Sequence, residues 1–525
     1  MSRPAVVIRV DSGAQMGSGH LMRCLTLAGE LKSRGAEVRF VCRTLAGNLI
    51  ERVELAGYRL DCLPAPAAIE GANDAVSTQH QDAAQTLAAL GTDRVSWIVV
   101  DHYGLDALWQ RSVRPATERL LVIDDLANRP HEADLLLDQN YLGANTTQRY
   151  TGLVAASCRC LLGPRYALLQ PGYRQLRRRL QVRAGSVGRI LVFFGAHDPS
   201  DSMLAVLQAL TRPEFAALTV DAVLGSDAQQ AARARALARH ASNILFHEDL
   251  PGLAELMAAA DLAIGAGGAT TWERACLGLP SVVATVTENQ VPIAEALAAA
   301  GCILLAGPAS AMSADRWHGL LRELLNDELR LSEMSQKSYR LTDGFGAGRV
   351  ARLIIGAGNA QIRLRPVGAE DEWLLLEWAN DPGTRHFSFS KHPITAAEHQ
   401  RWLRERLADP GCSLLIGEDA AGLPLGQLRF DSTPGGEEST IHVGIDPAFR
   451  GCGVGTTLVQ QAVTAWCAHG SGSRLLAEVS SDNRASQRLF LRANFTPTAP
   501  RRPNSVAFEF PRGSMSAPHP KEHGA

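Results

Sequence analysis

Glycine-rich turns between predicted strands and helices carry the residues of this chain that are best suited to chemistry. The first turn contains Gly17, Gly19 and His20, and it follows the apolar run Val6–Val10. Glycines let the backbone approach a ligand, and the N-terminus of the following helix favours negative charge. A neutral histidine there suits general-base chemistry, although a capping or core histidine fits the pattern about as well. We expect an anionic ligand at this turn.

A turn in the middle of the chain has the composition of a nucleotide site. Gly267 and Gly268 precede Thr270, and Glu273 lies one turn into the predicted helix that follows. Glycines and a hydroxyl suit a diphosphate, and a carboxylate at this position can accept two ribose hydroxyls. We therefore expect this turn to bind a nucleoside diphosphate.

A third turn, near the C-terminus, follows the predicted strand Ser439–Ile445 and opens a predicted helix. It contains Arg450, Gly451, Gly453 and Gly455. This geometry again presents backbone N–H groups to phosphates, but its sequence context differs from that of the first turn. The chain therefore predicts two enzymes in one polypeptide.

The composition is that of an ordinary globular protein: 525 residues, 46% hydrophobic, 20% charged, with a net charge of −2. A chain of this length is too long to fold around one hydrophobic core, so we expect two or three domains. The near-neutral charge argues against a nucleic-acid or membrane partner. The absence of a signal peptide, a long apolar run or a disulfide pattern among the 10 cysteines favours a cytoplasmic protein. No dense cluster of histidines and carboxylates indicates a metal site.

Short apolar runs alternate with helical segments in two successive blocks, as in parallel sheets covered on both faces. The first block predicts strands at Val6–Val10, Glu37–Cys42, Trp97–Val100, Leu120–Ile123 and Leu135–Leu137. After a basic connecting segment, residues 164–186, the second predicts strands at Ile190–Phe194, Leu218–Leu224, Ile244–Phe246, Leu262–Ile264 and Ser281–Val286. We expect two Rossmann-like halves, residues 1–165 and 166–356, with a ligand cleft between them.

The rest of the chain predicts a smaller α+β domain, residues 361–511, after a short linker. It is richer in Trp and Phe, and it offers four antiparallel strand candidates, Ser413–Glu418, Gly426–Phe430, Ser439–Ile445 and Arg474–Val479. The polar tail, residues 512–525, is expected to be disordered.

The middle and N-terminal turns resemble known sugar-nucleotide enzymes. The segment GGATTWE, which begins at Gly267, resembles the nucleotide-sugar loop of two-domain inverting glycosyltransferases related to the peptidoglycan N-acetylglucosaminyltransferase. The run IRVDSGAQMGSGHLMRCLTLAGEL, which begins at Ile8, resembles the UDP-sugar hydrolases of pseudaminic acid biosynthesis. These hydrolases cleave UDP from UDP-2,4-diacetamido-2,4,6-trideoxy-β-L-altropyranose. The resemblance covers roughly residues 4–350 and implies a GT-B-like fold with twin Rossmann-like halves.

This resemblance implies a role for His20 as the base that activates water for direct displacement of UDP with inversion. It implies that Asp11 and Tyr103 line the sugar pocket and position substrate or water. It implies that Gly268 and Glu273 bind the nucleotide and that Asn289 and Gln290 face the sugar-phosphate. The resemblance implies no metal. The pair Asp124 and Asp125 fits strand-end solvation or capping better than catalysis. Transfer to a sugar or lipid acceptor is the alternative within the same fold.

The C-terminal turn, R-x-x-G-x-G from Arg450, resembles the R/Q-x-x-G-x-G/A loop of GNAT acyltransferases, whose N–H groups bind the pyrophosphate of coenzyme A. Downstream, the segment from Asn483 to Phe495 resembles the family's N-x-x-S-x-x-x-Y/F…G-F pattern. The resemblance implies acetyl-CoA as the acetyl donor. It also implies that Asn483 and Ser486 contact the pantetheine side of the cofactor.

The chain departs from the GNAT pattern at Phe490, where many members carry a tyrosine proposed to protonate the leaving thiolate. It also has Asn494 where a glycine is usual, although asparagine tolerates left-handed backbone angles. As the base for the incoming amine we select Glu478, with His442 second. For each of the two, an ordinary surface or core position in a strand explains the residue slightly better than a catalytic role.

Acetylation of the C4 amine of a UDP-amino-sugar and removal of UDP are consecutive steps in pseudaminic acid biosynthesis, so a fusion of the two is chemically coherent. The predicted partners are UDP-amino-sugar substrates. Two alternatives stay open: a glycosyltransferase fused to an acetyltransferase for another amino sugar, and a nucleotide-sugar-binding scaffold with a degenerate acetyltransferase domain.

Overall fold

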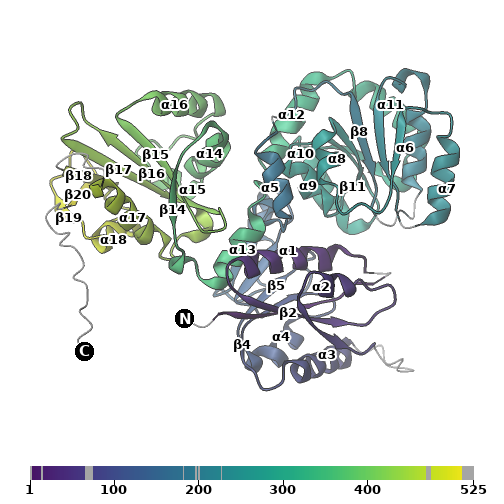
Figure 1. Cartoon of the computed structure of the whole chain (residues 1–525), viewed down its shortest axis with the longest axis horizontal. Coiled ribbons are helices and arrows are strands. Elements are labelled where there is room, and N and C mark those ends of the chain that lie inside the picture. The colour runs from purple at the N-terminus through teal and green to yellow at the C-terminus, as the bar shows by residue number, and fades with distance from the viewer. Residues whose placement is uncertain are drawn as a thin grey trace, which may run out of the picture. The chain divides into compact units, whose positions relative to one another are not determined.

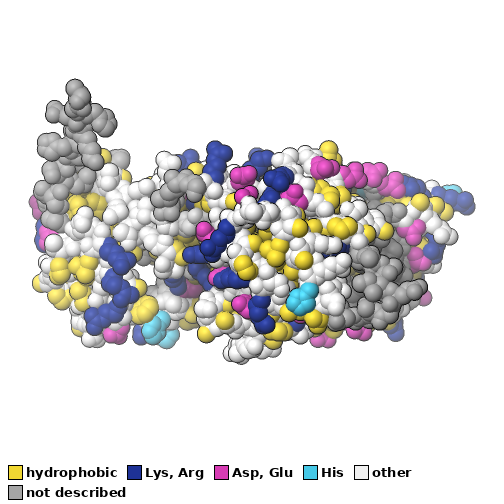
Figure 2. Space-filling view, turned by 90° about the horizontal axis from the view of Figure 1, so that it is seen from below, with side chains coloured by type: hydrophobic (Ala, Val, Ile, Leu, Met, Phe, Trp, Pro, Cys, Tyr) yellow, Lys and Arg dark blue, Asp and Glu magenta, His cyan; other side chains and the backbone are white. Residues whose placement is uncertain are grey.

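The computed structural model describes residues 3–13, 16–65, 75–180, 182–195, 198, 201–225, 227–468 and 474–510. The chain divides into two compact units, Met1–Ala351 and Arg352–Ala525. The tail predicted to be disordered, residues 512–525, lies outside the described residues. No helix in the described ranges is long and apolar enough to cross a membrane. The face drawn in Figure 2 carries both basic and acidic side chains.

The first half of unit 1 is a parallel sheet whose described strands follow the order β3-β2-β1-β4-β5-β6-β7. Helix α1 covers one face, and α3 and α4 cover the other (Figure 1). The strands are β1 Ala5–Val10, β2 Glu37–Arg43, β3 Arg59–Leu63, β4 Val95–Asp101, β5 Thr117–Ile123, β6 Leu135–Asp138 and β7 Arg159–Leu162. The helices are α1 Gly19–Ser33, α2 Glu51–Leu55, α3 Ala75–Leu90 and α4 Ala107–Val113. Strands β3 and β7 lie at the two edges of the sheet. Edge strands carry polar as well as apolar residues, so these two were not predicted from continuous apolar runs.

The second half repeats the plan with the strand order β10-β9-β8-β11-β12-β13, again parallel throughout the described part. Its strands are β8 Arg189–Phe193, β9 Thr219–Val223, β10 Ile244–His247, β11 Leu262–Ala266, β12 Ser281–Thr285 and β13 Leu304–Pro308. The helices are α5 Pro171–Arg177, α6 Ser202–Leu210, α7 Ala228–Leu237, α8 Ala254–Ala259, α9 Thr270–Cys276, α10 Val291–Ala299, α11 Ala314–Leu324, α12 Glu328–Tyr339 and α13 Gly346–Ile355. One apolar cluster packs on each face of the sheet.

Unit 2 is built on a mixed sheet with the order β14-β15-β16-β17-β18-β20-β19 among its described strands. The strands are β14 Arg363–Pro366, β15 Cys412–Glu418, β16 Pro424–Ser432, β17 Glu438–Ile445, β18 Arg474–Ser480, β19 Thr496–Thr498 and β20 Ser505–Phe510. The helices are α14 Glu372–Asn380, α15 Pro382–Phe387, α16 Ala396–Ala408, α17 Val454–Ala468 and α18 Arg484–Arg492. Two parallel Rossmann-like sheets followed by this mixed sheet confirm the predicted fold class.

One strand pairing corrects the sequence analysis. The four strand candidates were expected to be antiparallel, but β17 and β18 run parallel, because α17 crosses between them. Only Glu438–Thr440 of β17 pairs with β18. Beyond Thr440, β17 pairs with β16 alone, so the sheet opens there. Val443 and Ile445, on the open part, line a cavity.

The basic connecting segment serves the second half as a set of helix caps. Arg183 donates to the carbonyls of Met257, Ala260 and Leu277, at the C-terminal ends of α8 and α9. Helix C-termini leave carbonyls without partners and carry partial negative charge, so a cation is favoured there. Arg177 binds the Cys276 and Tyr339 carbonyls in the same way. The positive charge of this segment is therefore used within the fold.

We predict that Arg183→Met destabilises the protein by about 2–3 kcal/mol, because the charged donor is lost and several helix-end carbonyls lose their partner. Urea denaturation measures the change. Arg179→Met, at an exposed position of the same segment, is the matched control and should leave stability unchanged. Equal stability of the two variants would show that the caps contribute nothing.

Candidate functional site

The first candidate site forms where β1 turns into α1. Gly17 closes the turn: its N–H donates to the Gly13 carbonyl over 2.8 Å, and its φ of +76° is a left-handed conformation that glycine adopts without strain. Helix α1 begins at Gly19, so His20 lies in its first turn, with a buried side chain. The protein therefore holds the imidazole in a defined position.

Asp101, at the carboxyl end of β4, fixes the imidazole. Its Oδ1 lies 2.6 Å from His20 Nδ1, and Arg23 donates to both of its oxygens over 2.6 Å. Burial alone would raise the pKa of Asp101, but Arg23 and His20 outweigh burial and hold the pKa well below its ordinary value. An ionised Asp101 can accept a hydrogen bond from Nδ1–H, and in that tautomer of the neutral imidazole Nε2 carries the lone pair.

Tyr103 lies against the same imidazole. The rings of His20 and Tyr103 meet edge to face, with centroids 4.7 Å apart. Burial, and the nearby negative charge of Asp125, raise the pKa of Tyr103 well above its ordinary value, so its hydroxyl stays protonated. The structure brings these two predicted site residues together. It adds Asp101 and Arg23, to which the sequence analysis assigned no role; the signal available was a carboxylate at the carboxyl end of a strand.

Asp11 lies in a buried ion-pair network and is 1% exposed. It accepts hydrogen bonds from Arg9 over 2.5 and 2.8 Å and from the Arg43 N–H over 2.7 Å. Nε2 of His102 lies 3.4 Å from Asp11 Oδ2. These contacts fix the start of the loop, and a role for Asp11 in placing substrate or water stays a prediction.

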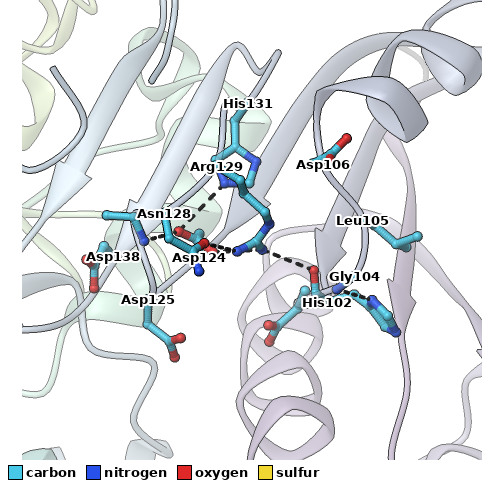
Figure 3. A network of polar contacts seen from close by, with 12 residues as sticks. His102, Gly104, Leu105, Asp106, Asp124, Asp125, Asn128, Arg129, His131 and Asp138 are labelled. Carbon is cyan, nitrogen blue, oxygen red and sulfur yellow. Dashed lines mark hydrogen bonds and ion pairs between the residues drawn. The ribbon is translucent and has the colours of Figure 1, made fainter. Parts of the chain in front are cut away.

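Polar contacts join the loops that follow β4 and β5, next to the end of β6 (Figure 3). Asp124 lies 2.8 Å from Arg129 and accepts from the Ala127 N–H over 2.8 Å. Arg129 in turn donates to the His102 carbonyl over 3.3 Å. Burial raises the pKa of the neighbouring Asp138 to about 6. Asp124 therefore holds the loop after β5 in place through Ala127 and Arg129.

The second candidate cluster lies at the carboxyl ends of β11 and β12. A side chain at Gly265 would place its Cβ 2.0 Å from the Phe193 carbonyl oxygen, so only glycine lets β11 end this close to β8. Gly267 and Gly268 follow, and Thr270 begins α9. A Cβ at Gly267 would lie 3.5 Å from Gln290, so the structure brings these two predicted residues together.

Glu273, in the first turn of α9, lies beside Tyr173 of α5, and burial raises the pKa of Glu273. Gln290 accepts from the Val286 N–H over 3.0 Å, and Asn289 accepts from the Thr287 hydroxyl over 2.5 Å. Tyr173 was not predicted, because it lies 100 positions before Glu273 in the sequence. The hydrogen bonds of Gln290 and Asn289 shape the loop after β12, beside the glycines.

The third candidate site is a cavity of about 450 Å³ in unit 2. It is lined by Arg450, Gly451, Gly453, Gly455, Asn483 and Ser486, all predicted to bind the cofactor. Gly451 and Gly453 have φ values of +76° and +85°, which turn the loop ahead of α17. The Asn483 side chain accepts from the Ser486 N–H over 3.0 Å and so caps α18.

The predicted acid–base residues of unit 2 lie in other surroundings. Phe490 is buried and stacks edge to face on Phe495, with centroids 5.1 Å apart. Glu478 accepts from the Ser505 hydroxyl over 2.7 Å and from the Arg501 N–H over 3.0 Å. Burial alone would raise the pKa of Glu478, but these hydrogen bonds lower it, which weakens it as a base. His442 lies 3.0 Å from Asp431. A role for Glu478 stays a prediction.

Comparison with known proteins follows the division of the fold. Residues 361–496 match the family model described as an acetyltransferase (GNAT) domain. This part of the chain is therefore a GNAT domain, which follows two Rossmann-like sheets. No group of three or more His, Cys, Asp or Glu side chains that could hold a metal ion occurs among the described residues.

The chain is a homologue of sugar-biosynthesis proteins. It is 26% identical to UDP-2,4-diacetamido-2,4,6-trideoxy-β-L-altropyranose hydrolase from Campylobacter jejuni over 171 residues, which are 32% of this chain and 53% of the relative. It is 25% identical to spore coat polysaccharide biosynthesis protein SpsG from Bacillus subtilis over 343 residues, 64% of this chain and 90% of the relative.

Two further matches have lower sequence identity. An uncharacterized protein from Methanocaldococcus jannaschii is 22% identical over 96% of this chain and 99% of its own length, which is consistent with the fused arrangement. The crystal structure of MurG from Acinetobacter baumannii matches 67% of this chain and 99% of that protein, with 16% identity and a TM-score of 0.48.

The buried carboxylates predict an acid-sensitive fold. The pKa values of Asp11, Asp101 and Asp124 are lowered, so their stabilisation is present above the ordinary value of 3.8 and is lost as pH falls toward the folded values. We expect the free energy of unfolding to fall from about pH 5 downward, by about 2 kcal/mol for each strongly shifted carboxylate. Urea denaturation across this range measures it.

Asp101→Asn should show a shallower loss of stability with falling pH than the wild type, because one of these carboxylates is removed. Asp315→Asn is the control, because Asp315 is exposed and pairs with Arg212 at the surface. This variant should keep the wild-type dependence of stability on pH. A slope unaltered by Asp101→Asn would contradict the lowered pKa.

Proposed function

We propose that the chain is a bifunctional enzyme of UDP-amino-sugar metabolism. Its first activity hydrolyses UDP-2,4-diacetamido-2,4,6-trideoxy-β-L-altropyranose to the free sugar and UDP. Its second transfers the acetyl group of acetyl-CoA to the C4 amine of UDP-4-amino-4,6-dideoxy-N-acetyl-β-L-altrosamine. The parts that carry these activities are residues 1–165 with 166–356, and 361–511.

The observation that carries the hydrolase assignment is the contact between His20 and Asp101. The Asp101 carboxylate accepts a hydrogen bond from Nδ1–H of the neutral imidazole, so Nε2 is free to remove a proton from water, and Asp101 stabilises the imidazolium that forms. The water oxygen then forms the new bond to the anomeric carbon, while the bond to the UDP oxygen breaks and its electron pair leaves with UDP. Attack opposite the leaving group inverts the anomeric configuration.

The leaving group is assigned to the second half of unit 1. Gly267, Gly268 and Thr270 offer backbone N–H groups and a hydroxyl to the diphosphate. Glu273, beside Tyr173, accepts the ribose hydroxyls. Asn289 and Gln290 face the sugar-phosphate in this proposal, and Tyr103, with its protonated hydroxyl beside His20, faces the sugar.

The acetyltransferase assignment is supported by the GNAT match and by the cavity beside the loop from Arg450 to Gly455. The N–H groups of this loop, at the start of the 15-residue helix α17, suit the diphosphate of coenzyme A. Because Phe490 has no hydroxyl, the leaving thiolate takes its proton from another donor or from solvent.

We predict that His20→Asn lowers the rate of UDP release by about 10²–10⁴-fold, because the general base is lost, and leaves acetyl transfer unchanged. Phosphorus and proton NMR with UDP-4-amino-4,6-dideoxy-N-acetyl-β-L-altrosamine and acetyl-CoA follows both steps. Asp101→Asn should also slow UDP release, because the ring loses its orienting partner.

His240→Asn, at an exposed histidine of unit 1, is the matched control and should retain full activity. Near-wild-type hydrolysis by His20→Asn would overturn the proposed base. UDP release that requires an added sugar or lipid acceptor would identify a glycosyltransferase instead.

We also predict that Gly453→Ala raises the Kd for acetyl-CoA by about tenfold or more, because a side chain at a φ of +85° shifts the loop N–H groups away from the diphosphate. Isothermal titration calorimetry measures the change. Gly422→Ala is the control: Gly422 has a φ of +76° in the turn between β15 and β16, so the strain is matched. Equal Kd values for both variants would count against the loop as the diphosphate site.

A further inference from the structure

The cofactor cavity of unit 2 is lined by three arginines. Arg450, Arg488 and Arg492 contribute to its wall, and no Asp or Glu is among the described residues that line it. A cleft lined by charge of one sign attracts ligands of the opposite sign. The cavity as a whole therefore suits a ligand with several negative groups.

Arg450, the arginine of the glycine-rich loop, is already paired within the protein. It donates to Asp381 over 2.5 Å and to the Thr384 hydroxyl over 2.8 Å. Asp381 also accepts from the Thr384 N–H over 2.9 Å and so caps α15. Arg450 thus links α15 to the loop, and its guanidinium is the least available of the three.

Arg488 and Arg492 are in the opposite situation. Both are exposed side chains of α18, and neither guanidinium has a hydrogen bond or ion pair to any other group in the described part of the chain. They are four residues apart, so they are neighbours on one side of the helix. Like charges at this spacing repel each other, and an anion bound by both would relieve the repulsion.

Coenzyme A carries two separate phosphate groups, the diphosphate and the 3′-phosphate of its ribose. The backbone N–H groups of the loop before α17 account for the diphosphate, as proposed above. We infer that Arg488 and Arg492 form the site for the 3′-phosphate, and this inference rests on the proposed use of acetyl-CoA. Guanidinium groups donate paired hydrogen bonds that match phosphate oxygens, so two of them can hold a dianionic phosphate at an exposed position.

The test compares coenzyme A with dephospho-coenzyme A, which differ only in the 3′-phosphate, by calorimetry on the full chain. We expect the wild type to bind coenzyme A about tenfold more tightly than the dephospho form. The double variant Arg488→Ala with Arg492→Ala should lose this preference and bind both forms with the wild-type affinity for dephospho-coenzyme A. That retained affinity shows that the cavity is intact.

Arg484→Ala is the matched control, because Arg484 lies on the same helix, contacts Gln487 over 3.4 Å and does not line the cavity. It should keep the wild-type preference. The preference should also shrink as salt is raised, since the site is exposed.

Four outcomes would overturn the inference. Equal binding of both forms by the wild type, or an unchanged preference in the double variant, rejects the assignment of these arginines and leaves the proposed acetyl-CoA use standing. A double variant that loses affinity for UDP, and not for coenzyme A, places the acceptor's diphosphate at this site. Failure of the wild type to bind either form of the cofactor rejects the proposed acetyltransferase together with the inference.

Discussion

A buried negative charge on Asp101 is the constraint on which the N-terminal site depends. A carboxylate removed from water is costly unless charged or hydrogen-bonded partners surround it. Here Arg23 donates to both oxygens, and His20 and Cys24 also contact the carboxylate. These residues all come from the first turns of α1 and the end of β4, so the strand, the helix and the imidazole are fixed by one interaction. Tyr103, two residues beyond Asp101, is placed by the same strand end.

In unit 2 the site depends on a gap in the sheet, where two neighbouring strands stop pairing. Strand β17 leaves β18 after Thr440 and remains paired with β16, so its outer edge is free for a ligand while the strand stays in the sheet. Positive φ values at Gly451 and Gly453 then turn the chain into α17 within a few residues. Backbone geometry, more than side-chain chemistry, makes this cavity.

Local patterns in the sequence predicted much of this fold. Continuous apolar runs identified the central strands of both parallel sheets, since those strands are buried on both faces. Edge strands such as Arg59–Leu63 were not predicted, because they are only partly buried and contain both polar and apolar residues. The parallel pairing of β17 and β18 escaped because direction depends on the crossover through α17, which strand composition does not encode.

The sites divide in the same way. His20 and the glycines around it were predicted because their arrangement is local, and so was the Asn483 segment. Asp101 and Tyr173 were not, because each meets its partner across a large sequence separation, 81 residues for Asp101 and His20. A contact of that kind follows from the strand order, β1 beside β4, and not from any pattern near either residue.

The helix caps supplied by Arg183 also limit how this protein can change in evolution. A connection between two domains ordinarily tolerates insertions and deletions, because few contacts depend on its length. Here the segment that ends in Arg183 is bound to carbonyls of two helices of the second half, so a shift of even one residue would move the cation off both helix ends. Related chains should therefore vary in length before Pro171, and keep a constant number of residues from there to β8.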